Sequence, residues 1–100
     1  MRRTAIVTGG AGGIGGAVIA RLTREGYAVA SWDLSDTAPE AALALSVDVT
    51  DADTIEQAAR TTEAELGAPS VLVVNAGVLG PTSPLWEIAP SEFRRVIEAN

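Results

Sequence analysis

The chain has 100 residues and a formal net charge of −6, so it is long enough for one domain and too acidic to favour nucleic acid as a partner. Cysteine and histidine are absent, which excludes disulfides and thiolate metal sites and argues against zinc, so we expect no metal site. Hydrophobic residues make up 47% of the chain and aromatic residues 4%, which predicts an α/β core of Val, Ile, Leu and Ala. With no signal peptide and no apolar run long enough to cross a bilayer, we expect a cytoplasmic location and no membrane partner.

The first expected strand, 4–7, leads into a glycine-rich turn, Thr8-Gly9-Gly10-Ala11-Gly12-Gly13-Ile14-Gly15, and then into a helix. Glycines in such a turn let the backbone approach a phosphate, and the N-terminus of the helix directs free N–H groups at the same point. Two spacings overlap in this turn. Gly10, Gly12 and Gly15 fit G-x-G-x-x-G, whereas Gly9, Gly13 and Gly15 fit T-G-x-x-x-G-x-G, and spacing alone does not decide between them.

The first helix is expected over 13–25, with Ile14, Val18 and Leu22 on its buried face and Gly26 as a left-handed cap. The second strand, 28–32, ends at Asp33, which lies 18 residues beyond Gly15. A carboxylate at about this distance suits the hydroxyl groups of a ribose. The turn and Asp33 together predict a dinucleotide-binding site.

A third strand is expected over 44–47, ending at Asp48, and Thr50 is the expected N-cap of a second helix with Asp53 at its third position. That helix should end at Gly67 and Pro69. Its expected buried face consists of small and aliphatic side chains: Ala52, Ile55, Ala59 and Leu66.

The fourth strand, 71–74, is apolar at every position, which predicts cover on both faces, and Asn75 ends it. A long irregular segment, 76–89, follows, and in it Leu85 and Trp86 either line a substrate pocket or pack a short helical turn onto the domain. Pro90 suits the first position of a third helix. Right-handed crossovers then predict a parallel sheet in the order third, second, first, fourth strand, with the first helix on one face and the other two on the opposite face.

Together, Thr8-Gly9-x-x-x-Gly13-Ile14-Gly15, Asp33, Asp48-Val49, Asn75-Ala76-Gly77 and Asn100 resemble the short-chain dehydrogenase/reductase family in order and spacing along the whole chain. The resemblance implies a doubly wound, Rossmann-type α/β fold and selects the Gly9, Gly13, Gly15 register. It also implies an NAD-dependent oxidoreductase acting on a small alcohol or ketone, with a homotetramer as the usual assembly.

The resemblance assigns a role to each matching residue. Gly9, Gly13, Ile14 and Gly15 would contact the pyrophosphate and its ribose, Asp33 the adenosine ribose, and Asp48 and Val49 the adenine. Asn75, Ala76 and Gly77 would line the adenosine side. Gly12 and Leu34 stand where NADP-preferring relatives often carry Arg or Lys, and Asn100 would hold a water that links the catalytic Lys to solvent.

Structural alternatives stay open for three of these residues. The Asn75 amide could simply satisfy neighbouring backbone groups, Asp48 could be a polar residue that ends a strand, and Asn100 could be a polar residue that breaks a helix. The catalytic Ser and Tyr-x-x-x-Lys of the family have no match here, because the chain contains no Lys and its only Tyr is Tyr27. We therefore expect residues 1–100 to be a single dinucleotide-binding domain, incomplete at its C-terminus, that is inactive by itself. A non-catalytic dinucleotide-binding or sensing module and a larger epimerase or dehydratase are the alternatives, and Asn75-Ala76-Gly77 argues against the latter.

Overall fold

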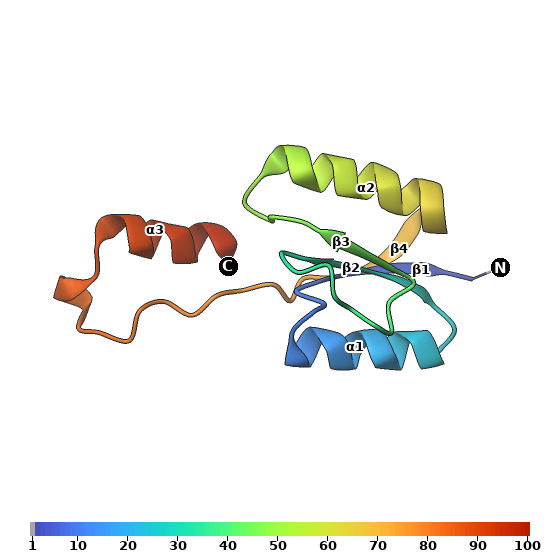
Figure 1. Ribbon diagram of the computed structural model, residues 1–100, viewed down its shortest axis with the longest axis horizontal. Coiled ribbons are helices and arrows are strands. Elements are labelled where there is room, and N and C mark those ends of the chain that lie inside the picture. The colour runs from blue at the N-terminus through green and yellow to red at the C-terminus, as the bar shows by residue number, and fades with distance from the viewer. Residues whose placement is uncertain (1) are drawn as a thin grey trace.

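The computed structural model describes residues 2–100 and contains one four-stranded parallel sheet with three α-helices and a short 3₁₀ helix (Figure 1). In chain order the elements are β1 (Thr4–Thr8), α1 (Gly13–Arg24), β2 (Ala28–Asp33), β3 (Leu43–Ser46), α2 (Ala52–Leu66), β4 (Pro69–Val73), η1 (Leu85–Glu87) and α3 (Pro90–Ala99). The strand order is β3-β2-β1-β4, and every neighbouring pair is parallel. The predicted order and the parallel sheet are confirmed.

The helices α1 and α2 cover opposite faces of this sheet, as Figure 1 shows. On the α1 side, Val7, Ile19 and Val29 form a buried cluster. On the α2 side, Ile6 and Trp32 belong to a second cluster, which partly buried residues of α2 and β3 complete. Two cores on opposite faces of one sheet are the arrangement expected of a doubly wound fold, so this part of the prediction is confirmed.

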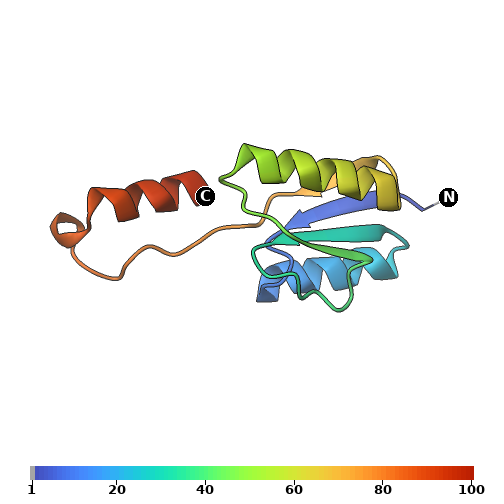
Figure 2. The same ribbon diagram turned by 45° about the horizontal axis from the view of Figure 1, so that its top comes forward.

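The position of α3 differs from the prediction, because α3 does not pack on the sheet face that α2 covers. Figures 1 and 2 show it beyond the carboxyl edge of the sheet, at the end of a long extended segment. That segment contains Pro81 and Pro84, which favour extended backbone. No residue of α3 is buried, and the molecule measures 53 × 26 × 20 Å along its principal axes.

The predicted cover of the fourth strand is also wrong. β4 begins at Pro69, earlier than predicted, and lies at the edge of the sheet beside β1. Leu72 is 59% exposed, and Val74, just beyond the strand, is 78% exposed. The apolar run is therefore continuous, but only its Val71 and Val73 side chains pack against the cluster under α1.

The first helix has the expected span but a different buried face. Ile14 is 75% exposed, whereas Ile19 is the fully buried residue of α1 and Val18 and Leu22 pack against its cluster. Ile14 lies in the first turn of α1. Gly26 adopts a φ of 93°, as predicted for a left-handed cap.

The start of α2 is one residue later than predicted. Asp51, not Thr50, is the N-cap, and its Oδ1 accepts a hydrogen bond of 3.0 Å from the N–H of Asp53. Thr50 is unavailable because its hydroxyl donates to Asp48. The buried positions of α2 are Ala58 and Thr62, with Ile55 and Leu66 partly buried; Ala52 and Ala59 are exposed, contrary to prediction.

Candidate functional site

The glycine-rich turn joins the carboxyl end of β1 to the start of α1. Gly9 adopts a φ of 71°, and its N–H donates to the carbonyl of Trp32 at 2.8 Å. A Cβ at Gly9 would meet the Asn75 amide at 2.9 Å, and one at Gly15 would collide with the Gly9 carbonyl. A Cβ at Gly13 would meet nothing within 4 Å. Packing therefore requires glycine at Gly9 and Gly15 but gives no reason for it at Gly13.

Thr8 connects this turn to the end of β4. Its Oγ1 accepts hydrogen bonds of 3.0 Å from the N–H groups of both Asn75 and Ala76. The Asn75 side chain in turn donates from Nδ2 to the Gly9 carbonyl at 3.3 Å. The geometry thus gives the Asn75 amide the structural task that the sequence left as an alternative.

Asp33 stands at the carboxyl end of β2, next to the turn. Its Oδ2 accepts a hydrogen bond of 3.1 Å from the Ala11 N–H, and its Oδ1 accepts one of 3.0 Å from the Ser35 N–H. Both bonds come from backbone groups, so they fix the direction of the carboxylate without neutralising its charge. Each carboxylate oxygen keeps a lone pair that a hydroxyl group could use.

Asp48 follows β3 and lies in a short turn with Thr50. Hydrogen bonds from the Thr50 hydroxyl, at 2.6 Å, and from the Thr50 N–H, at 2.9 Å, lower the pKa of the Asp48 carboxyl. A lowered folded-state pKa means that these bonds stabilise the fold above the ordinary pKa of the carboxyl. This stabilisation is lost as the pH falls through the lowered value, and Asp48 is ionised at neutral pH.

One cavity of about 220 Å³ brings most of the predicted residues together at the carboxyl edge of the sheet. The predicted residues that line it are Gly9, Asp33, Leu34, Asp48, Val49, Ala76 and Gly77. The other predicted cofactor residues lie outside this lining, on the adjoining turn, the first turn of α1 and the end of β4: Gly13, Ile14, Gly15 and Asn75. Parallel strands end at the same edge, which explains why residues so far apart in sequence meet here.

Further residues that line this cavity were not predicted from the sequence. They are Trp32, Val47, Thr50, Val78 and Ala99. Of these, Trp32 carried a usable signal, because it immediately precedes Asp33 at the end of a predicted strand. The others lie in stretches whose sequence pattern predicts only a strand end, a helix cap, a loop or a helix.

Asn100 is the C-cap of α3 and lies outside the cavity lining. Its Nδ2 donates to the carbonyls of Val78, at 3.0 Å, and Val96, at 2.8 Å, and its Oδ1 accepts from the Val78 N–H at 3.3 Å. The side chain therefore fastens the end of α3 to the segment that follows Asn75-Ala76-Gly77. A Cβ at Gly77 would collide with the Asn100 amide oxygen, so this approach requires glycine there.

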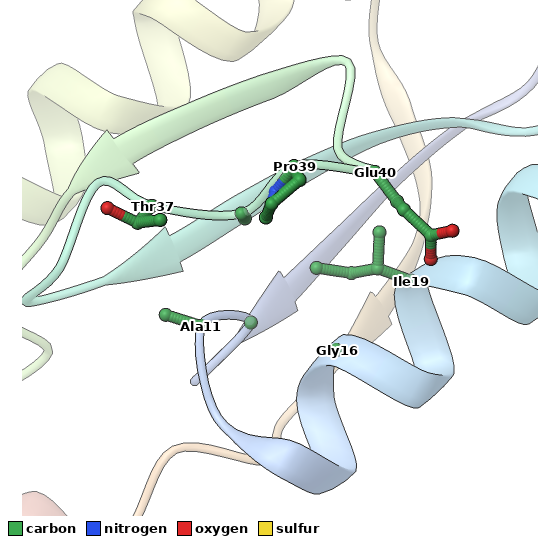
Figure 3. A pocket seen from close by; sticks show the side chains of 8 residues that line it. Ala11, Gly16, Ile19, Thr37, Pro39 and Glu40 are labelled. Atoms are coloured by element: carbon green, nitrogen blue, oxygen red, sulfur yellow. The ribbon is translucent and has the colours of Figure 1, made fainter.

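Further hollows border these elements. A small cavity of about 100 Å³ lies between the turn, α1 and the segment after β2, with Ala11, Ile19 and Pro39 among its lining residues (Figure 3). A wider groove of about 530 Å³ runs between η1 and α3 and includes Leu85 and Phe93. The expected short helical turn forms at η1, but it does not pack onto the domain, since Trp86 is 85% exposed.

Comparison with known proteins shows the family to which this chain belongs. The model of the short chain dehydrogenase family matches residues 3–100. The chain belongs to this family. In Sphingomonas sp. (strain SKA58), the family member 2-dehydro-3-deoxy-L-rhamnonate dehydrogenase (NAD(+)) is 43% identical over 105 residues, an alignment that covers 98% of this chain and 42% of that protein. Cis-4-hydroxycyclohexanecarboxylate dehydrogenase of Sinomonas cyclohexanicum is 40% identical, with 96% and 43% covered.

Solved structures share this fold. A short-chain dehydrogenase/reductase from Serratia marcescens superposes with a TM-score of 0.85 at 31% identity, covering 97% of this chain and 44% of that one. The 3-ketoacyl-(acyl-carrier-protein) reductase of Brucella melitensis, crystallised with NADH, superposes with a TM-score of 0.90 at 22% identity, covering 97% and 43%. The chain thus spans less than half the length of these relatives.

Residues 2–100 show neither a membrane-spanning helix nor a cluster of metal-binding side chains. Every helix in that range is too short or too polar to cross a lipid bilayer. The same residues hold no group of three His, Cys, Asp or Glu side chains arranged to bind a metal ion.

Proposed function

We propose that residues 1–100 form one dinucleotide-binding domain that binds the adenosine-diphosphate half of NAD in an oxidoreductase. The observation that carries the proposal is the cavity at the carboxyl edge of the sheet, where Gly9, Asp33 and Asp48 meet beside the N-terminus of α1. A similar protein named as an NAD(+) dehydrogenase, 43% identical over nearly the whole chain, supports the choice of cofactor.

The residues around the cavity fit such a ligand. Space is open at Gly13, where packing does not require glycine, so a pyrophosphate can approach the backbone there. The N-cap of α1 is Gly12, which has no side chain to occupy the free N–H groups of the first turn. No acidic residue lies in that turn, which leaves the positive end of the helix available to an anion.

Each residue then has a task that its position allows. The turn and the first residues of α1 bind the pyrophosphate: Gly9, Gly13, Ile14 and Gly15. Asp33 accepts hydrogen bonds from the adenosine ribose, with Leu34 beside it. Asp48 accepts from the adenine amino group, and the Val49 N–H donates to a ring nitrogen. Ala76 and Gly77 form the opposite wall, which Asn75 supports through its bonds to the turn.

The bound NAD supplies the hydride acceptor for oxidation of an alcohol to a carbonyl compound, or NADH the donor for the reverse reaction. We propose a small alcohol or ketone as the substrate, which the names of the two dehydrogenase relatives support. Asn100 contributes to the catalytic part of the site, because its hydrogen bonds to Val78 fix the segment that follows Gly77. A homotetramer and a cytoplasmic location are further proposals that rest on the family. A purely non-catalytic dinucleotide module has no support among the relatives named above.

Asp33 determines the choice between NAD and NADP. Its carboxylate stands where the 2′-phosphate of NADP would lie, and two like charges in contact repel each other. Neither Gly12 nor Leu34 offers a positive charge to offset this repulsion. We therefore expect the protein to bind NAD in preference to NADP.

The test is the dissociation constant of NAD and of NADP, measured by calorimetry on the wild type and on Asp33→Ala. A hydrogen bond to a charged group contributes roughly 1.5–3 kcal/mol, so Asp33→Ala should weaken NAD binding by about ten- to a hundredfold. NADP binding should change little or improve. Adding Leu34→Arg should move the preference further towards NADP, because Arg supplies a phosphate partner.

Two controls separate charge from structure in this experiment. Asp33→Asn keeps an oxygen for the Ala11 N–H, so it should preserve the turn while removing the repulsion of NADP. Asp36→Ala removes the same charge from an exposed residue outside the cavity and should leave both dissociation constants unchanged. A wild type that prefers NADP, or a ratio unaffected by Asp33→Ala, would refute the assignment of Asp33 to the ribose.

A further inference from the structure

Trp32 belongs both to the core and to the proposed nucleotide cavity. It lies in β2 immediately before Asp33 and is 6% exposed. It packs with Ile6 and Ala58 in the cluster between the sheet and α2. It also lines the cavity that contains Asp33 and Asp48. An aromatic residue therefore forms part of the wall of this cavity.

The indole of Trp32 is fixed from behind by α2. Its Nε1–H donates to the Oγ1 of Thr62 at 3.1 Å, a buried contact between residues 30 apart in the sequence. Thr62 is fully buried on the inner face of α2, a position at which an aliphatic residue would ordinarily pack. A buried N–H needs an acceptor, and the Thr62 hydroxyl is the acceptor that this indole has.

We propose that Trp32 forms an apolar aromatic wall of the purine subsite and that Thr62 is a positioning residue that fixes the orientation of the indole. This inference rests on the proposed function, since it takes the cavity to hold the adenosine half of NAD. A flat aromatic wall suits a purine, because an aromatic ring makes favourable contact with the face or edge of a base. Without the Thr62 hydroxyl, the indole N–H loses its hydrogen-bond acceptor. This loss favours rotation of the ring towards the cavity, where water or ligand can accept the hydrogen bond.

The first measurement uses tryptophan fluorescence, because the chain has two tryptophans and the other, Trp86, is 85% exposed. The variant Trp86→Phe leaves Trp32 as the only tryptophan of the chain and changes no residue of the cavity. ADP-ribose and NAD should change the intensity or wavelength of Trp32 emission as they saturate the site. Nicotinamide mononucleotide, which has no adenine, should leave the emission unchanged.

The second measurement compares Thr62→Val with Thr62→Ser in the same background. Val keeps the shape of Thr but removes the acceptor, whereas Ser keeps the hydroxyl and loses only the methyl group. If the hydrogen bond sets the subsite, Thr62→Val should raise the dissociation constant of ADP-ribose about tenfold and shift the emission of the free protein. Thr62→Ser should remain within about twofold of the wild type, whereas a purely packing role for Thr62 would give the opposite ranking.

Three results would overturn the inference. They are Trp32 emission that ignores saturating ADP-ribose, equal ADP-ribose affinity in Thr62→Val and the wild type, and a Ser variant weaker than the Val variant. Calorimetry of NAD binding to the wild type distinguishes failure of this inference from failure of the proposed function. Measurable NAD binding with any of these results refutes the roles of Trp32 and Thr62 alone, while absence of NAD binding refutes both proposals.

Discussion

The hydroxyl of Ser31 is the one buried side-chain polar group without a hydrogen-bond partner among residues 2–100. Ser31 is fully buried in β2, directly beneath Gly10, where a Cβ would collide with the Ser31 side chain. A small residue is therefore needed at position 31, but the hydroxyl is not. Leaving such a group unpaired costs about 1–3 kcal/mol of stability.

We expect Ser31→Ala to raise the free energy of unfolding by about 1 kcal/mol, because it removes the unpaired hydroxyl and keeps the small side chain. For a chain of this size the melting temperature should rise by roughly 4–8 °C. Thermal unfolding followed by circular dichroism measures this change. Ser83→Ala, at an exposed residue of the irregular segment, is the control and should have no effect. A lower melting temperature for Ser31→Ala would show that its hydroxyl has a partner in solution.

At the scale of the element, the two adjacent glycines Gly15 and Gly16 of α1 should respond in opposite ways to alanine. A Cβ at Gly16 would meet only the Gly10 carbonyl, at an ordinary contact distance of 3.8 Å. Gly16 borders the small cavity beside the turn (Figure 3), so a methyl group has room there. Gly16→Ala should stabilise the protein by about 0.5–1 kcal/mol, because glycine inside a helix is entropically unfavourable.

Gly15→Ala should strongly destabilise the protein, because its methyl group would collide with the Gly9 carbonyl. Denaturant unfolding of the two variants beside the wild type measures both effects. Equal responses of Gly15→Ala and Gly16→Ala would contradict the packing of α1 against the turn.

The elements themselves were predictable from the sequence because their signals are local. Apolar strands that alternate with amphipathic helices along the chain predict the order of the sheet. The helix cap at Gly26 could be predicted from the local sequence alone. Which of two neighbouring residues caps a helix was not predictable in the same way. Thr50 and Asp51 are both good N-caps, and Asp51 takes this role because the Thr50 hydroxyl bonds to Asp48.

The candidate site was predictable where polar residues follow the ends of parallel strands, because these ends meet at one edge of the sheet. Asp33 and Asp48 are examples. Trp32 was missed although it immediately precedes Asp33, because an apolar strand residue is ordinarily assigned to the core. Thr62 was missed because a polar residue on an amphipathic helix is ordinarily assigned to the exposed face. Only the fold reveals that the two side chains meet.

At the scale of the whole molecule, β4 leaves an apolar edge uncovered. Leu72 and Val74 line an open cavity of about 260 Å³ together with Ile55 of α2 and the end of α3. An open, apolar edge strand is a template for association with other chains. The arrangement of α3 beyond the sheet adds exposed Phe93 and Ile97.

We therefore expect the 100-residue chain to self-associate as its concentration rises, as measured by light scattering coupled to size-exclusion chromatography. Leu72→Lys should shift the population towards monomer, because it places a charge on the exposed edge. Ser70→Lys, on the same strand at an exposed polar residue, adds the same charge without removing apolar surface and should have a smaller effect. A wild type that stays monomeric and melts cooperatively at high concentration would contradict this expectation.

The hydrogen bonds that Thr8 accepts from Asn75 and Ala76 span 67 and 68 residues, and they constrain when the glycine-rich turn can be completed. During synthesis, β1, α1 and β2 emerge and can pair long before those residues exist. Until β4 docks, the Thr8 hydroxyl lacks both of its N–H donors and the Gly9 carbonyl lacks the Asn75 amide. The glycine-rich turn is thus completed only when β4 docks. A nucleotide bound as we propose would stabilise the folded protein by mass action, but it could not help a nascent chain that has not yet reached residue 75.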